Sequence, residues 1–313
     1  MFKFAKLVTA AALASTAMAG MALAEYPEKP VEFVVPWPPG DLEDVLTRMI
    51  AEDFQAAYGV PTAVVNKPGG GGPFPGAVEV ANAPADGYTI GSFIIAVPVV
   101  GPMIGIPDLN PDPFEPLGNF LTYPFVIAAG GNAPYDDVAG LAAYAKENDV
   151  VLGHFGAPLV PTQVTMGLAV EMGFSFAADA AFDALDCNTL ASGDVDVINT
   201  TLQLILPCLD DVKVLASIGS DRIPLTPDAP TVAELAPDMD VALWNGLFVH
   251  KDTPQDVREK IIAVAKTTMQ SERAQKLAAE TGAAVYWQDA EAVQAQIQKD
   301  ISTLDHIGKV LGN

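Results

Sequence analysis

The stretch 31–58 constrains the fold most, because it has the pattern of a buried strand, a tight turn and an amphipathic helix in direct succession. Val31–Val35 is an apolar run that a Pro-Pro-Gly sequence stops. Residues 41–58 then place apolar side chains at helical spacing, with Asp41 able to cap the helix and Asp44 placed as in a capping box. This order predicts an α/β fold whose first turn offers unpaired N–H groups to an anion. An ordinary βα turn closed by its own Asp side chains explains the pattern equally well.

The rest of the chain repeats this alternation, apart from residues 98–116, whose many prolines and glycines predict irregular surface. The predicted strands span 62–66, 88–95, 120–129, 150–152, 194–199, 212–217 and 241–249, and the predicted helices span 75–83, 136–147, 162–172, 180–191, 202–209, 253–269, 271–281 and 289–311. Strands that alternate with helices predict a parallel, doubly wound sheet, and the recurrence of the pattern predicts two similar lobes with a crevice between them.

The amino-terminal residues 1–24 have the pattern of a secretory signal peptide, with two lysines, an apolar run and Ala-Leu-Ala at the cleavage spacing. We therefore exclude them from the fold and expect a soluble, exported mature protein of two ordinary domains. The formal net charge of −23 disfavours a nucleic-acid partner. Cys187 and Cys208 can form one disulfide in an oxidising compartment or remain a free buried pair.

The common patterns of catalysis are missing from the sequence. No serine lies in a Gly-x-Ser-x-Gly frame, and His154, His250 and His306 are too far apart to form a metal-ligand motif. Four glycines from Gly69 suggest a phosphate loop, but neither the dinucleotide spacing nor Gly-Lys-Ser/Thr follows. A loop that needs unusual backbone angles is the favoured interpretation. We predict no catalytic residue, no metal and no cofactor.

Three acids open the helix that follows the first turn. Asp41, Glu43 and Asp44 could serve as general acids or bases, but the helical pattern places Glu43 toward solvent and assigns capping to the other two. Of the histidines, only His154 follows a predicted strand end in a glycine-rich loop, where ligand contacts are expected.

Several ordered motifs carry a family resemblance. They are Tyr26-Pro with Lys29-Pro30, Val34-Val-Pro-Trp-Pro-Pro-Gly40 with Asp44 and Arg48, Val65-Asn-Lys-Pro with Gly69 to Gly72, Ala85-Asp-Gly-Tyr-Thr89, and Asp228-Ala-Pro-Thr-Val-Ala-Glu234. Over essentially the whole mature chain the sequence resembles the periplasmic receptors of tripartite tricarboxylate transporters, the TctC or Bug proteins. The resemblance implies a two-lobed periplasmic-binding-protein fold, similar to type II, that closes on a small organic acid. It further implies a monomer that delivers the acid to a large and a small inner-membrane subunit.

The resemblance also implies a domain division and a binding site. Lobe 1 comprises residues 25–124 plus 244–313, lobe 2 comprises residues 125–243, and the hinge candidates are Tyr123-Pro124 and 241–245. Four loops supply the ligand-binding residues, in part through backbone amides. They are Trp37, Pro38, Pro39, Gly40, Asp41 and Asp44 in the first loop; Ser92, Phe93, Ile94 and Ile95 in the second; His154, Phe155, Gly156 and Thr162 in the third; and Asn199, Thr200 and Thr201 in the fourth.

The chain departs from the family pattern at its first loop. Gly40-Asp-Leu-Glu-Asp44 replaces the common Gly-Gly-Ser-Thr-Asp, which adds two acids and removes two hydroxyl groups. Bulky residues at 93–95 and 154–155, and Thr200 in place of a frequent aspartate, imply a more apolar pocket. We therefore expect a monocarboxylate with an apolar or aromatic body, or a zwitterion whose ammonium group meets Asp41. The alternative functions are a sensory module for a membrane kinase and, less favoured, an exported enzyme that uses Asp44 and His154.

Overall fold

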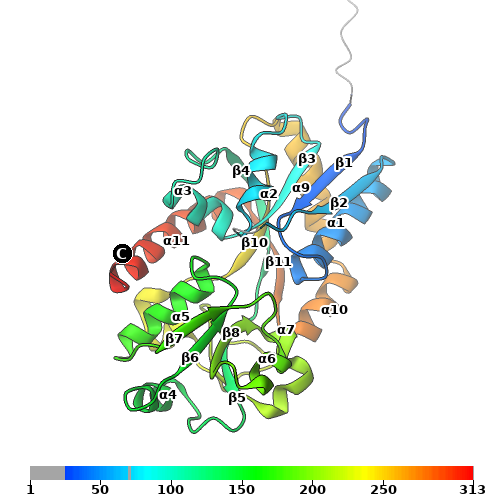
Figure 1. Cartoon of the computed structure of the whole chain (residues 1–313). Helices are drawn as coiled ribbons and strands as arrows, with labels where there is room; N and C mark the ends of the chain where they lie inside the picture. Colours follow the sequence, from blue (N-terminus) through cyan, green and yellow to red (C-terminus); the bar gives the residue numbers. More distant parts are fainter. Residues whose placement is uncertain (1–24, 70–71, 313) are drawn as a thin grey trace, which may run out of the picture.

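The computed structural model describes residues 25–69 and 72–312. Figure 1 shows two lobes, each built around its own mixed β-sheet with helices packed beside it. This architecture confirms the predicted two-lobed α/β fold. The predicted signal peptide lies outside the described residues.

The first sheet has six strands in the order β11-β4-β10-β3-β1-β2. Its strands are β1 (Val31–Val35), β2 (Thr62–Asn66), β3 (Thr89–Ile94), β4 (Phe114–Thr122), β10 (Trp244–His250) and β11 (Ala284–Asp289). Strands β1, β2 and β3 are parallel, whereas β10 runs antiparallel to both β3 and β4. Its helical segments are α1 (Leu42–Tyr58), α2 (Phe74–Ala81), a π-helical turn (Ala96–Val100), α3 (Gly101–Met103), α9 (Gln255–Met269), α10 (Glu272–Thr281) and α11 (Ala290–Val310).

The second sheet has five strands in the order β7-β6-β8-β5-β9. Its strands are β5 (Phe125–Gly130), β6 (Val151–His154), β7 (Ala178–Ala181), β8 (Val197–Thr201) and β9 (Val212–Ser217). The helical segments of this part of the chain are α4 (Val138–Ala145), α5 (Val160–Glu171), α6 (Cys187–Ser192), α7 (Leu202–Ile205), a 3-10 helix (Leu206–Asp211), α8 (Val232–Leu235) and a second 3-10 helix (Pro237–Met239). Strand β6 is parallel to β7 and β8, and β5 is antiparallel to β8 and β9.

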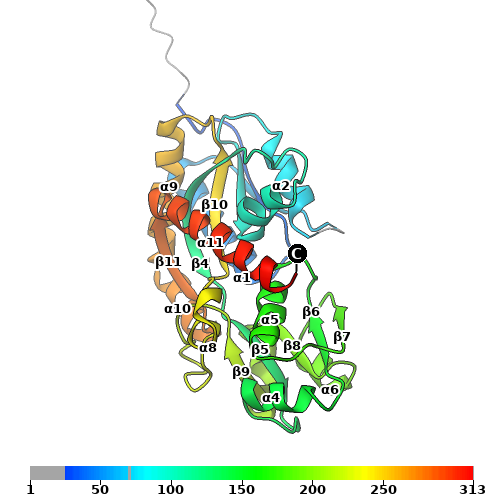
Figure 2. The same cartoon turned by 90° about the vertical axis from the view of Figure 1, so that its left-hand side faces the viewer.

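The chain passes between the sheets at Tyr123-Pro124, directly after β4, and returns through the segment that leads from β9 to β10. The two passages touch, because the Tyr123 N–H donates to the Leu243 carbonyl at 2.8 Å. Helix α11 packs against both β4 in the first lobe and α5 in the second, as Figure 2 shows. The lobes are therefore joined at the crossing and by one long helix.

Four predictions about local structure were wrong. The sheets are mixed because β4, β5, β10 and β11 pair antiparallel, so neither sheet is wholly parallel. The expected strand 120–129 is two strands, because Pro124 breaks it where the chain changes sheets. Ala-rich residues 180–191 begin in edge strand β7 rather than in a helix, because pairing with β6 outweighs alanine's helix propensity. Residues 98–116 are not irregular surface throughout, because they begin within the buried helical turn Ala96–Val100 and end within β4, which starts at Phe114.

Candidate ligand-binding site

The turn between β1 and α1 is held by one buried carboxylate. Asp44 accepts hydrogen bonds from the Gly40 N–H at 2.9 Å, from Asn66 Nδ2 at 2.9 Å and from Arg48 Nη2 at 2.8 Å. Burial alone would raise the pKa of Asp44, but these donors outweigh it and hold the pKa below the usual value. The predicted capping box is absent, because Asp41 makes no side-chain cap bond and Asp44 bonds Gly40, the residue before the cap. Asp44 therefore shapes this turn as a charged clamp.

Glu43 is buried, and the prediction that it faces solvent was wrong. Only 2% of the residue is exposed, and burial followed by the charge of Asp41 raises its pKa to about 8. Burial likewise raises the pKa of Asp41 itself. Helix α1 turns Glu43, Asp44 and Thr47 inward because the neighbouring strands offer polar partners there, which an apolar periodicity does not reveal.

A buried hydrogen-bonded chain runs from α1 to the crossing between the lobes. Thr47 Oγ1 donates to Ser92 Oγ at 2.8 Å, and Asn245 Nδ2 donates to the same oxygen at 2.8 Å. The Tyr123 hydroxyl donates to Asn245 Oδ1 at 3.3 Å and lies beside the Glu43 carboxyl group. Burial, and next the charge of Glu43, raise the Tyr123 pKa well above its ordinary value. Of these residues, only Ser92 was predicted as a ligand contact. Thr47 and Asn245 had no motif that could single them out.

A second polar cluster lies under the start of α5 in the other lobe. His154 ends β6 and Asn199 lies beside it on β8, one position beyond the registered pair Gly153–Ile198. Asn199 Nδ2 donates to Thr165 Oγ1 at 3.3 Å, and Thr162 lies one turn earlier on the same helix. Three buried atoms of this cluster have no hydrogen-bond partner: His154 Nδ1, Thr162 Oγ1 and Asn199 Oδ1.

Unpaired buried polar atoms need a physical explanation, because each costs about 1–3 kcal/mol. Asn119, Ser217, Thr226 and Thr253 also carry such atoms, but only the α5 cluster brings three of them together. A threonine hydroxyl can donate to a carboxylate, and a half-turn of the Asn199 amide would present its N–H₂ group as a second donor. His154 Nε2 bonds Asp179 Oδ1 at 2.7 Å, and because a carboxylate only accepts, the ring proton lies on Nε2 and Nδ1 is left as an acceptor. The arrangement can therefore bind an anionic oxygen of a small solute.

Three aromatic rings connect the two clusters. Tyr123 packs edge-on against Phe125 at 6.2 Å between ring centroids, and Phe125 packs in the same way against Phe155 at 6.3 Å. Tyr123 belongs to the first cluster, and Phe155 follows His154 of the second. Both polar clusters therefore have aromatic side chains beside them.

Several side chains that were predicted to bind ligand face elsewhere. The Phe93 ring stacks on Phe248 at 5.7 Å inside the core, which leaves its backbone as the only part that can serve a site. Ile95 is likewise buried in the core, and Ile94 packs against it. Thr201 is buried as well, whereas Pro38, Pro39 and Gly40 are exposed and Trp37, Asp41, Phe155 and Gly156 are half-buried.

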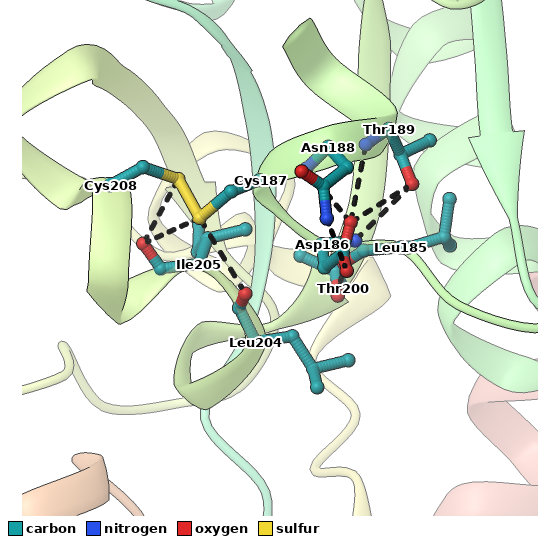
Figure 3. Close-up of a disulfide and its surroundings, with 9 residues drawn as sticks. All are labelled: Leu185, Asp186, Cys187, Asn188, Thr189, Thr200, Leu204, Ile205 and Cys208. Atoms are coloured by element: carbon teal, nitrogen blue, oxygen red, sulfur yellow. Dashed lines mark hydrogen bonds between the residues drawn. A yellow bond between two sulfur atoms is a disulfide. The ribbon is translucent and has the colours of Figure 1, made fainter. Parts of the chain in front are cut away.

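The Thr200 segment is braced by the disulfide. Thr200 Oγ1 donates to the Leu185 carbonyl at 2.6 Å. Figure 3 shows this bond beside the disulfide between Cys187 and Cys208, whose Cα atoms are 6.0 Å apart. The sequence had left the pairing of these cysteines open. The disulfide ties α6 to the 3-10 helix that follows α7, so it holds both sides of the loop after β8.

Within residues 25–69 and 72–312, no group of three or more His, Cys, Asp or Glu side chains is placed to hold a metal ion. Within the same ranges, no helix is both long and apolar enough to cross a bilayer.

Two sheet-based lobes, linked crossings and a buried polar site beside them define a solute-binding receptor of the periplasmic-binding-protein type. The model of the tripartite tricarboxylate transporter family receptor, TctC, matches residues 46–312, and the chain belongs to this family. The family assignment made from the motifs is thereby confirmed.

Individual relatives agree with this assignment. A UPF0065 protein of Agrobacterium vitis is 28% identical over 91% of this chain and 84% of its own length. Protein BugT of Bordetella pertussis is 28% identical, over 73% of this chain and 72% of its own. Among solved structures, the periplasmic binding protein BugD superposes with a TM-score of 0.77 at 27% identity, covering 92% of this chain and 99% of BugD. The family and the fold are those of receptors rather than enzymes.

Proposed function

We propose that the chain is a periplasmic receptor that binds a small organic acid and delivers it to a tripartite tricarboxylate-type secondary transporter. The observation that carries the proposal is the group of unpaired polar atoms under the start of α5, in a chain of the TctC family. Residues 1–24 would direct export, and the mature protein would act as a monomer with a large and a small membrane subunit as its partners.

The lobes of this receptor are residues 25–124 plus 244–313 and residues 125–243. Tyr123-Pro124 and 241–245 form the hinge, because the chain changes sheets there and the Tyr123 N–H donates to the Leu243 carbonyl. Hinge closure would bring the first turn of α1 toward His154, Thr162 and Asn199. The solute would then contact both polar clusters at once.

The surroundings of the site favour an acid with an apolar or aromatic body over a compact tricarboxylate. Apolar surface is supplied by Tyr123, Phe125 and Phe155. Aromatic side chains bind flat or apolar solutes well. Asp41 adds a second acidic side chain beside Asp44 at the turn, which disfavours a ligand with several carboxylates. A zwitterion whose ammonium group meets Asp41 is the second ligand class.

A thermal-shift screen tests the proposed function. Aliphatic and aromatic mono-, di- and tricarboxylates and amino acids are added to the mature protein, and each hit is measured by calorimetry. A true ligand at a hundredfold excess over its dissociation constant stabilises the protein by about 2.7 kcal/mol. Binding that is lost in Thr162→Val but kept in Thr226→Val, which removes an unpaired buried hydroxyl outside the cluster, supports the site. If no acid binds, the proposed function is refuted.

A further inference from the structure

Glu43 is a buried acid without a cation. It lies in the first turn of α1 and is 2% exposed. The neighbouring Arg48 is exposed and bonds Asp44 and Asn66. Among the described residues, no ion pair includes Glu43. A buried carboxylate without a positive partner is unstable, so the carboxyl group must find another way to satisfy its oxygens.

The groups that face Glu43 offer it no positive charge. Its own helix contributes Asp41 and Asp44, which repel a negative charge. The crossing after β4 contributes the Tyr123 hydroxyl, and β10 contributes Asn245, whose amide is neutral. An ionised Glu43 would therefore stand next to two acids and a phenol.

The hydrogen-bond directions around Tyr123 assign the proton. The Tyr123 hydroxyl has a single proton, which it donates to Asn245 Oδ1. Asn245 in turn uses Nδ2 on Ser92 Oγ, which also accepts from Thr47. If the Tyr123 proton turned instead to an ionised Glu43, it would lower the pKa of Glu43, but Asn245 Oδ1 would lose its donor. Both contacts of the Tyr123 hydroxyl are satisfied together only when Glu43 carries a proton of its own.

We propose that Glu43 carries a proton at neutral pH and donates it to Tyr123, and that binding of an organic acid at the adjacent turn requires this protonated form. Burial and the neighbouring Asp41, which raise the pKa of Glu43 to about 8, support the assignment. The inference rests on the proposed function and deepens it: the receptor would bind its acid together with a proton that stays on Glu43.

The physical reason for the coupling is electrostatic. Ionisation of Glu43 would place a further negative charge in the α1 turn that is to receive the acid's carboxylate. It would also remove the hydrogen bond to Tyr123 at the crossing between the lobes, where closure has to take place. By linkage, a solute that binds only the protonated form promotes proton uptake.

Calorimetry as a function of pH tests the inference. The probe is the monocarboxylate with the largest thermal shift in the screen, chosen so that it is fully ionised at the lowest pH used. Its affinity is measured from about pH 6 to about pH 10, in two buffers that differ in ionisation enthalpy. In the wild-type protein the affinity should fall about tenfold per pH unit above the pKa of Glu43, with net proton uptake on binding near that pKa.

Glu43→Gln should abolish both the pH dependence and the proton uptake, because an amide keeps a donor for Tyr123 but cannot ionise. The matched control is Asp112→Asn, a half-buried acid whose pKa is also raised, to about 6. Asp112 precedes Phe114, which pairs with His250 at the opposite end of the β4–β10 ladder from Trp244. This variant should keep the pH dependence of the wild type.

The outcomes separate the two proposals. If no acid binds at any pH, the proposed function fails. If an acid binds with the same affinity at every pH and without proton uptake, the receptor function stands and the role of Glu43 is refuted. Proton release on binding would also refute the role of Glu43. It would mean that Glu43 is ionised in the complex, as expected for a solute that presents an ammonium group to it.

Discussion

The buried Glu43 makes the stability of the empty protein depend on pH. Its pKa is about 8 in the folded protein against 4.5 for an ordinary glutamate. Between these two values the folded state binds more protons than the unfolded state, so the free energy of unfolding falls as the pH rises. Above both values the slope vanishes. Glu43→Gln removes this contribution and leaves the other titrating groups in place.

The size of the effect follows from the shift. Each pH unit between the two pKa values corresponds to about 1.4 kcal/mol, so the full shift amounts to roughly 5 kcal/mol. Asp112 and Asp300 also have raised pKa values, both about 6, and they lower the stability of wild type and variant alike. The difference between the two proteins therefore isolates Glu43.

Urea unfolding at a series of pH values measures that difference directly. The free energy of unfolding of wild type, minus that of Glu43→Gln, should decline through the range from about pH 5 to about pH 8 and be flat above it. Parallel curves for the two proteins would refute the burial and charge argument for Glu43. With Asp112→Asn in place of wild type, the difference from Glu43→Gln should still decline through the same pH range.

The remaining predictions concern the clamp, the unpaired hydroxyl and the disulfide. Asp44→Ala should lower the free energy of unfolding by about 1–3 kcal/mol, since the Gly40 N–H and the Asn66 amide lose their acceptor, and should weaken acid binding; unchanged urea curves and affinity would contradict the clamp role. Thr162→Val removes a buried hydroxyl that has no partner, so thermal unfolding should stay the same or rise while calorimetry shows weaker binding; full affinity would move the site elsewhere. The double change of Cys187 and Cys208 to serine should cost roughly 3 kcal/mol in urea unfolding, because the disulfide spans 21 residues, and an unchanged midpoint would speak against a stabilising role.

Local patterns predicted much of the framework. Val31–Val35, Thr62–Asn66 and Val212–Ser217 are strands with the predicted bounds, because short apolar runs between turn residues leave few alternatives. The pairing of strands that are far apart in the sequence was harder to predict. Strand β11 was missed, and its pairing with β4 depends on residues far away in the sequence.

The candidate site was predicted only in part, and the reason is side-chain orientation. A loop can be located from glycines, prolines and strand ends, but the sequence does not show that Phe93 packs into the core. The sequence also does not show that the Glu43 side chain points inward to Tyr123, because this orientation depends on polar partners from β3 and from the chain crossing. Apolar periodicity assigns acids to the solvent side by default.

The most direct test of the proposed receptor function is a crystal structure of the mature protein with an acid that stabilises it in the thermal-shift screen. We expect the acid between the two lobes, with a carboxylate within hydrogen-bonding distance of the α1 turn and another polar contact at Thr162 or Asn199. An acid bound outside both polar clusters, with Thr162 Oγ1 and Asn199 Oδ1 still without partners, would contradict the proposed site.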